Sequence, residues 1–279
     1  MKVIPLGFNH HQHDQQWKEY QYIDKTVWCD AFFHKENGFQ QLGTLGGGNH
    51  FIELGINELD DVWIVIHSGS RGVGNLLAKH YMALARPDNT PKEGVYGLKF
   101  DSPEGQAYYR DMSFMLEFAL ENRRQMITKI MEVLKTFDPS AKALEGQLIN
   151  RTHNHAEPKG NFIIHRKGAT HAEKDMLGVI PGHMTHGSYI VVGRGNPDSL
   201  YSSSHGAGRV LGRKAAERTL DLDIMKLQIE EAGVAAGADN IKSLQEAPDA
   251  YKPPEDVMAL QQDLISVVYH IKPLVNIKG

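Results

Sequence analysis

The amino-acid sequence predicts an α+β fold, because one clear helical pattern and several strand-like runs share a chain of 279 residues. The longest helical pattern covers Asp111–Leu134, where apolar residues recur every three or four positions on one face. The clearest strand is Val62–His67, a continuous run rich in β-branched residues. Glycine and proline punctuate further short runs. We therefore expect one domain in which mixed, short-stranded sheets are flanked by helices.

The first part of the chain divides at about residue 40. Residues 1–40 are polar and aromatic with little periodicity, so we expect an irregular N-terminal arm, followed by the main domain at residues 41–279. A glycine-rich loop then leads into a strand at Phe51–Leu54. After the strand at Val62–His67, a turn-forming loop precedes a helix at Asn75–Ala85.

The second half of the chain predicts short strands followed by helices. The expected strands are Leu148–Ile149, Phe162–His165 and Tyr189–Val192. Two helices are expected at Lys214–Ala236 and Glu255–Tyr269, the second with a stripe of Val257, Leu260, Leu264, Val267 and Val268 and with prolines at its start. A strand at Leu274–Ile277 ends the pattern.

Composition narrows the class of protein. Hydrophobic residues make up 41% and charged residues 23%, which are ordinary values for a globular protein. The net charge of −4 argues against coating nucleic acid by bulk charge, although a few arginines can still form a local basic groove. The single cysteine, Cys29, excludes an intrachain disulfide, and the longest apolar runs are about five residues. We expect a cytoplasmic protein with no membrane partner.

Four segments place a histidine beside glycines or another polar group. They are GGGNHFIE (46–53), HSGSRGVG (67–74), His153–Asn154 and SHGAGR (204–209). Neutral imidazole is a good ligand for divalent transition metals, and glycines let backbone N–H groups approach a phosphate closely. Arg71 and Arg209 add planar guanidinium groups that match phosphate oxygens and are candidate contacts for RNA phosphates. The combination favours transfer of a phosphoryl or nucleotidyl group.

Each of these signals has a simpler interpretation when it is taken alone. A glycine-rich turn is usually only a turn, and this one is neither a Walker loop nor a dinucleotide fingerprint. His67 could be a core histidine, and His153 and His155 could lie on the surface. The recurrence of the pattern favours a shared site. The histidines at 10, 11 and 13 lack such support and are expected to be solvated.

Seven motifs in order closely resemble the RtcB family of GTP- and manganese-dependent RNA-splicing ligases. They are LGTLGGGNHFIE, VWIVIHSGSRGVGN, THNH, RKGATHA, VIPGHM, SSSHGAGRV and VNIKG, and the resemblance runs from Pro5 to Gly279. It implies an RtcB-like catalytic domain built around a central cleft for metal and nucleotide.

The resemblance also implies the roles of individual residues. His205 would be the nucleophile that becomes guanylylated, and His50, His67 and His153 would hold Mn²⁺. The implied nucleotide-binding residues are Asn49, His50, Phe51, Ile52, Glu53, His153, Asn154, Pro181, Gly182, His183, Met184, Ser188, His205, Gly206, Ala207, Gly208 and Lys278. The implied partners are GTP, RNA in the form of tRNA halves or broken ends, and an archease-like activator.

The implied reaction joins an RNA 3′-phosphate or 2′,3′-cyclic phosphate to a 5′-hydroxyl. It would proceed through the guanylylated histidine and an RNA end capped as a 3′-diphosphate-linked guanosine. Two other functions remain open from the residues. The chain could be a truncated or degenerate paralogue that binds GTP or RNA without ligating, or a metal-dependent phosphoesterase.

The sequence departs from the family pattern in two places. The family's metal-binding motif DxGCGM does not occur in these residues, and Cys29 in VWCD does not match it. We therefore expect this chain to lack the family's N-terminal Asp-x-x-Cys segment and, by itself, to bind manganese weakly, because neutral nitrogen ligands favour zinc or nickel. The second departure is His183, which stands where the family usually has the serine of PGSM.

Overall fold

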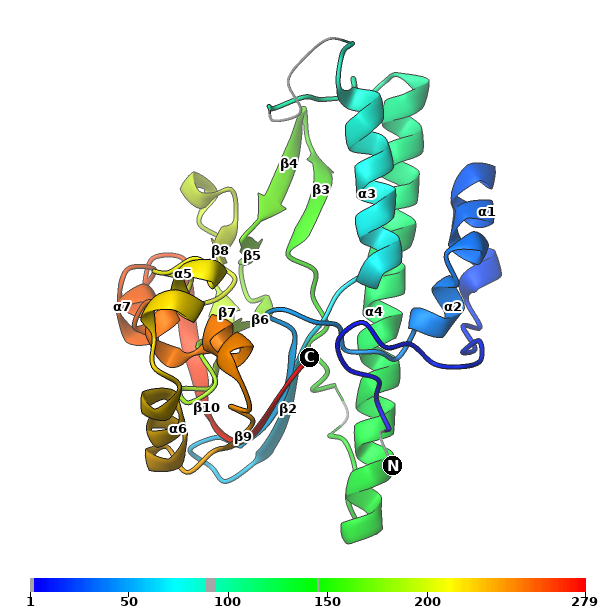
Figure 1. Ribbon diagram of the computed structural model, residues 1–279. Coiled ribbons are helices and arrows are strands. Elements are labelled where there is room, and N and C mark those ends of the chain that lie inside the picture. The colour runs from blue at the N-terminus through cyan, green and yellow to red at the C-terminus, as the bar shows by residue number, and fades with distance from the viewer. Residues whose placement is uncertain (1–2, 89–93, 145) are drawn as a thin grey trace. The chain divides into compact units, whose positions relative to one another are not determined.

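The computed structural model describes residues 3–88, 94–144 and 146–279, which group into two compact units (Figure 1). The first unit comprises Met1–Gly46 and Ser68–Lys142, and the second comprises Gly47–His67 and Ala143–Gly279. Helices dominate the first unit and strands the second. The predicted α+β class is therefore confirmed.

The first unit is built on two long helices. Its elements are the 3₁₀ helix Tyr20–Tyr22, α1 (Val27–Lys35), α2 (Gly38–Gln41), α3 (Arg71–Ala85) and α4 (Pro103–Phe137). The expected helices at 75–85 and 111–134 are confirmed, and both begin earlier than predicted. Helix α4 starts where Ser102 Oγ accepts a hydrogen bond from Gly105 N, with Pro103 in the first turn. Within the described residues, no helix combines the length and apolarity needed to cross a bilayer.

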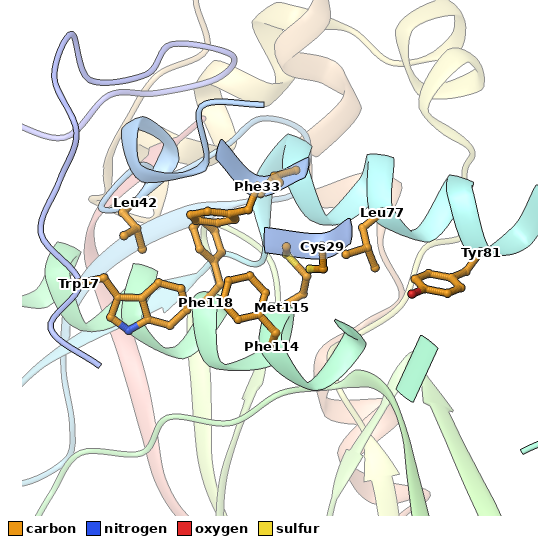
Figure 2. Close-up of a cluster of buried hydrophobic side chains, with 10 residues drawn as sticks. Trp17, Cys29, Phe33, Leu42, Leu77, Tyr81, Phe114, Met115 and Phe118 are labelled. Atoms are coloured by element: carbon orange, nitrogen blue, oxygen red, sulfur yellow. The ribbon is translucent and has the colours of Figure 1, made fainter. Parts of the chain in front are cut away.

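The first forty residues contain more regular structure than the expected irregular arm. Thr26 caps α1 by accepting a hydrogen bond from Cys29 N, and its own N and Oγ each donate to the carboxylate of Asp111. Figure 2 shows the hydrophobic core that these helices share, in which Phe33 and Phe118 are fully buried. Tertiary packing of aromatic residues thus stabilises short helices whose local periodicity is weak. Cys29 lies in this core, and burial raises the pKa of its thiol.

The second unit contains a sheet in the order β2–β1–β10–β7–β6, with β9 also paired to β10. The strands of this sheet are β1 (Phe51–Ile56), β2 (Val62–His67), β6 (Leu177–Pro181), β7 (Ser188–Gly193), β9 (Ala235–Ala236) and β10 (Ile265–Lys278). Two further pairs are β3 (Asn154–Lys159) with β4 (Phe162–Lys167), and β5 (Ala169–His171) with β8 (Ser202–Ser204). The strands expected around residues 51–54, 62–67, 162–165, 189–192 and 274–277 are confirmed, whereas Leu148–Ile149 is not a strand.

The helices of the second unit are short. They are α5 (Arg213–Thr219), α6 (Leu222–Glu231) and α7 (Pro254–Ala259), with 3₁₀ helices at Pro197–Ser199, Ile241–Glu246 and Pro248–Ala250. The single helix expected at 214–236 is therefore two helices. Asp221 separates them by capping the start of α6 through its carboxylate.

The prediction of a helix at Glu255–Tyr269 is wrong beyond Ala259. Helix α7 begins at Pro254 as the prolines predict, but it ends at Ala259, and β10 starts at Ile265. The apolar residues after Leu264 are largely β-branched, and they pair with β7 instead of continuing the helical stripe. A short apolar stripe can fit the period of a helix and that of a strand, and here pairing with β7 makes these residues a strand.

A bulge sets the register between β1 and β10. The pairing shifts between Leu54 and Gly55, and a Cβ on Gly55 would lie 2.4 Å from the carbonyl oxygen of Lys272. Glycine is required at this close approach of two backbones. The bulge leaves Phe51 opposite Lys278, which positions the end of β10 beside the glycine-rich loop.

Candidate functional site

Two rows of side chains cross the sheet where β1 begins. Phe51 pairs with His67 on β2 and with Lys278 on β10, so these three residues share one face. Glu53 lies two residues further along β1 and pairs with Asn276. Side chains that are far apart in sequence therefore meet because three strands are in register.

Four histidines from four chain segments lie close together in the second unit. His50 precedes β1, His67 ends β2, His153 precedes β3 and His205 follows β8. The Nε2 atoms of His67 and His153 are 3.3 Å apart. Ring centroids are separated by 5.6 Å for His50–His67, 5.3 Å for His67–His153 and 4.8 Å for His153–His205. The structure thus brings together the three candidate metal ligands and the candidate nucleophile.

The separation of two of these histidines, His67 and His153, fits a divalent transition metal. Two imidazoles on one tetrahedral ion have nitrogens about 3.3 Å apart, from metal–nitrogen distances of about 2.0–2.1 Å. The Nε2 separation of His67 and His153 matches that value. Burial lowers the pKa of His67 well below its usual range, with further lowering by His153 and His50, so its ring is held in the neutral form that binds metals.

His205 lies at the start of a loop with a fixed backbone. Ala207 N donates to Pro181 O at 3.0 Å, and Lys252 N donates to Gly208 O at 3.0 Å. Gly208 has a φ of 75°, which suits glycine at this turn. Burial lowers the pKa of His205, while a hydrogen bond with the Gly168 backbone raises it. The net lowering favours a neutral imidazole at neutral pH.

Glu53 is a buried carboxylate with two hydrogen-bond donors. Its side chain is 1% exposed and accepts hydrogen bonds from Ser188 Oγ at 2.9 Å and Asn276 Nδ2 at 3.1 Å. Burial raises its pKa to about 7, although both hydrogen bonds and the charge of Lys278 act in the opposite direction. Glu53 therefore exchanges its proton near neutral pH.

A second buried acid, Glu246, gathers several polar partners and was not predicted from the sequence. Lys278 Nζ lies 3.5 Å from its carboxylate, and Arg209 Nη1 lies 3.4 Å away. The hydroxyl of Tyr251 donates to it, and Arg213 Nε lies 3.7 Å away. No periodicity or motif marks Glu246 in the sequence. The only available signal was that buried cations need a counter-charge.

Arg209 lies inside this network, and one nitrogen of its guanidinium group is left for a further partner. Its Nε donates to Leu211 O, and Nη1 lies near Glu246 and Tyr251. Nη2 is buried and makes no hydrogen bond to the part of the chain that the structure describes. Arg71 belongs to the first unit, where it donates to Thr44 Oγ1 and Gly7 O and where burial lowers its pKa to about 10. Their roles toward RNA stay predictions.

The remaining predicted nucleotide residues differ in exposure. Asn49 and His153 are half-buried, Asn154 is exposed, and Phe51 and Ile52 are buried. Met184 is 1% exposed and packs with Met225, Ile229, Leu244 and Ala247, so its side chain belongs to a hydrophobic core. Its predicted contact with a nucleotide would therefore involve the backbone.

His183 lines a surface pocket of about 440 Å³. His186, Tyr251 and Glu255 also line this pocket, and Thr185 Oγ1 lies 3.1 Å from His183 Nδ1. Burial lowers the pKa of His183 and lowers that of His186 to about 4, with His270 contributing to the second shift. Both rings are therefore neutral at physiological pH and can accept or donate hydrogen bonds in the pocket.

Comparisons with known proteins agree on one family. The family model described as "tRNA-splicing ligase RtcB" matches residues 7–279. The RNA-splicing ligase RtcB of Escherichia coli K12 is 33% identical over 286 residues, which cover 95% of this chain and 68% of that protein. The tRNA-splicing ligases RtcB of Nanoarchaeum equitans and Thermococcus kodakarensis are 31% and 28% identical, with 99% and 88% of this chain and 68% and 61% of those proteins covered.

Proposed function

This chain belongs to the tRNA-splicing ligase RtcB family, and we propose that it acts as an RNA ligase that uses GTP and manganese. It would join an RNA 3′-phosphate or 2′,3′-cyclic phosphate to a 5′-hydroxyl. The observation that carries this proposal is the placement of His205, whose ring centroid lies 4.8 Å from that of the metal-ligand candidate His153. A simple phosphoesterase would have no need for a nucleophilic histidine and a nucleotide cradle at the same place.

In the first step, His205 would attack the α-phosphate of GTP and displace pyrophosphate. A neutral imidazole has the free electron pair that this attack requires, and its lowered pKa keeps it neutral. The hydrogen bond with the Gly168 backbone would hold one ring nitrogen and leave the other for the attack. The backbone around Gly206 and Gly208 would accept the phosphate without steric hindrance from side chains.

The buried acid of β1 would select the base. Glu53, held by Ser188 and Asn276, offers carboxylate oxygens that can accept the N–H groups of guanine. The ammonium group of Lys278, 4.9 Å from the centre of the Phe51 ring, would lie near the same nucleotide. Bound at His50, His67 and His153, manganese would neutralise phosphate charge during transfer.

The second and third steps transfer guanylate to the RNA 3′-phosphate and then displace it. The phosphoramidate of His205 is energetic enough to cap the RNA end, and the 5′-hydroxyl then attacks with GMP as the leaving group. The proposed activity would require RNA and GTP, and an archease-like activator is a further expected partner. The activator and a cytoplasmic location stay predictions from the sequence.

A ligation assay tests the proposal. The protein is incubated with Mn²⁺, GTP, one RNA that ends in a 3′-phosphate and another that begins with a 5′-hydroxyl. We expect a joined product that depends on GTP and needs a high Mn²⁺ concentration, because neutral imidazole ligands bind this ion weakly, with ATP as the negative control. Removal of the terminal phosphate without joining would instead identify a phosphoesterase. RNA binding with neither change would identify a binding protein.

We expect Arg209→Gln to weaken RNA binding evenly across sequences, because phosphate contacts carry no base information. The slope of log affinity against log salt should fall by about one unit for each lost phosphate contact. Fluorescence anisotropy at several salt concentrations measures this slope. Arg218→Gln, at an exposed position of α5, is the matched control and should leave the slope unchanged. An unchanged slope in Arg209→Gln would remove this residue from the RNA-binding surface.

A further inference from the structure

A second histidine cluster lies on the strands β3 and β5, separate from the four histidines described above. His155 and His171 face each other with their Nε2 atoms 3.1 Å apart, and their rings are stacked with centroids 5.0 Å apart. Glu157 Oε2 lies 3.9 Å from His155 Nε2 and 3.8 Å from His171 Nε2. Two imidazoles and one carboxylate therefore direct one ligand atom each toward a common point.

From this geometry we infer that His155, Glu157 and His171 form a binding site for a zinc-like divalent transition metal. Nitrogens that share a tetrahedral ion lie about 3.3 Å apart, which is close to the observed separation. The carboxylate of Glu157 must move by only about half an ångström to complete three ligands. A fourth position would remain for water or another donor.

Neighbouring groups prepare two of these ligands. Glu173 Oε2 lies 3.1 Å from His171 Nδ1, so that nitrogen donates to the carboxylate and Nε2 keeps its lone pair for a metal. Arg166, with 1% of its side chain exposed, hydrogen-bonds the other oxygen of Glu157 and leaves Oε2 directed at the imidazoles. This arrangement of an outer carboxylate, a histidine and a metal is common in protein metal sites.

The charge balance indicates the kind of ion. Glu157 and Glu173 are offset by Arg166 and by Lys159, whose Nζ lies 3.4 Å from Glu173. A hard cation such as magnesium or calcium prefers a surplus of oxygen ligands and negative charge, which is missing among these groups. Nitrogen donors instead favour ions late in the divalent series, of which zinc is the natural probe.

Such an ion would act on structure and not on the reacting atoms. His155 lies two residues after His153, and His171 ends β5, which pairs with β8 immediately before His205. Cross-linking β3 to β5 would fix the strand that follows one metal-ligand candidate relative to the strand that precedes the nucleophile candidate. This inference needs neither GTP nor RNA and does not rest on the proposed ligase activity.

Zinc binding to the metal-stripped protein, measured by equilibrium dialysis, tests the inference. His67→Gln is included in every sample to remove binding at the first cluster. We expect this protein still to bind zinc, and the added change His171→Gln to weaken that binding at least about 100-fold. His165→Gln is the matched control, because His165 is exposed on the neighbouring strand β4. The control should keep the affinity of its parent.

Two further measurements protect the test against misfolding. Glu173→Gln leaves all three ligands in place and should weaken zinc binding about 10-fold through the outer hydrogen bond. Cobalt in place of zinc should give strong visible absorption in the His67→Gln protein and lose it with His171→Gln. Equal zinc affinity with and without His171 or the Glu173 carboxylate would overturn the inference. The pair His155–His171 would then be a direct hydrogen bond between rings.

Discussion

Replacing His205 with alanine is expected to abolish the covalent guanylate adduct while leaving the fold intact. The ring is half-buried at the end of β8, and its removal leaves no other side chain of the loop able to attack a phosphate. Loss of a nucleophile lowers the rate by at least roughly 1,000-fold, so the adduct should fall below detection. The measurement uses GTP labelled in the α-phosphate, with the protein separated under denaturing conditions.

The chemistry of the adduct provides an internal check. A phosphoramidate of histidine is labile in acid and stable in alkali, whereas an ester of serine or threonine is not labile in acid. His165→Ala, at an exposed site on β4, should form the adduct like the unchanged protein. Label retained in His205→Ala would assign the nucleophile to another residue.

Replacing Glu53 with glutamine is expected to stabilise the protein and to impair guanylylation. Burial raises the pKa of Glu53 to about 7 from its ordinary value of 4.5. Below pH 4.5 the carboxyl is protonated in both the folded and the unfolded state, so its burial does not lower the free energy of unfolding. Between pH 4.5 and 7 the unfolded state releases the proton first, so the free energy of unfolding falls as pH rises. The full penalty above pH 7 is about 3 kcal/mol.

Glutamine removes this penalty because it stays neutral at every pH. Asn276 can adapt, since its Oδ1 is buried without a hydrogen-bond partner in the described part of the chain and a rotated amide would present it to the new N–H group. The melting temperature of Glu53→Gln should therefore exceed that of the unchanged protein at pH 8 and match it at pH 4.5. Glu230→Gln, exposed on α6, should show no such crossover.

Guanylylation should change in the opposite direction. A glutamine side chain has one oxygen that accepts and one NH₂ group that donates, so only one of its terminal atoms can accept an N–H group of guanine. We therefore expect adduct formation at pH 8 to fall by roughly 10- to 100-fold. In the unchanged protein, adduct formation should decrease as pH drops through about 7, where Glu53 takes up its proton. A Glu53→Gln protein with normal guanylylation would exclude this residue from base recognition.

The sequence allowed the four histidines to be assigned to one cluster, because each follows or precedes a short strand and lies beside glycines or, for His153, an asparagine. Such local patterns survive in the structure at His50, His67, His153 and His205. The partners of Lys278 could not be found in this way. Glu246 comes from a 3₁₀ helix with no motif of its own, and only the tertiary fold brings the two residues together.

Secondary structure could be predicted where a helical pattern was long. The prediction failed where pairing with another strand, and not local periodicity, determined the structure. Helix α4 showed a sustained pattern and was found, although its capping by Ser102 extended it beyond the predicted start. Strand β10 was partly assigned as helix because its first apolar residues fitted both periods. The early helices α1 and α2 were missed because aromatic packing in their core is what stabilises them.

The central position of β10 has a consequence for biosynthesis. Strand β1 is made early, yet one of its two neighbours, β10, follows about two hundred residues later in the chain. At a translation rate of about 5–20 residues per second, roughly 10–40 s pass between them. During that interval the β1–β2 hairpin exposes an unpaired edge in the nascent polypeptide, which invites wrong pairing with other chains. Neither Lys278 nor Asn276, which donates a hydrogen bond to Glu53, can reach its place until β10 has left the ribosome.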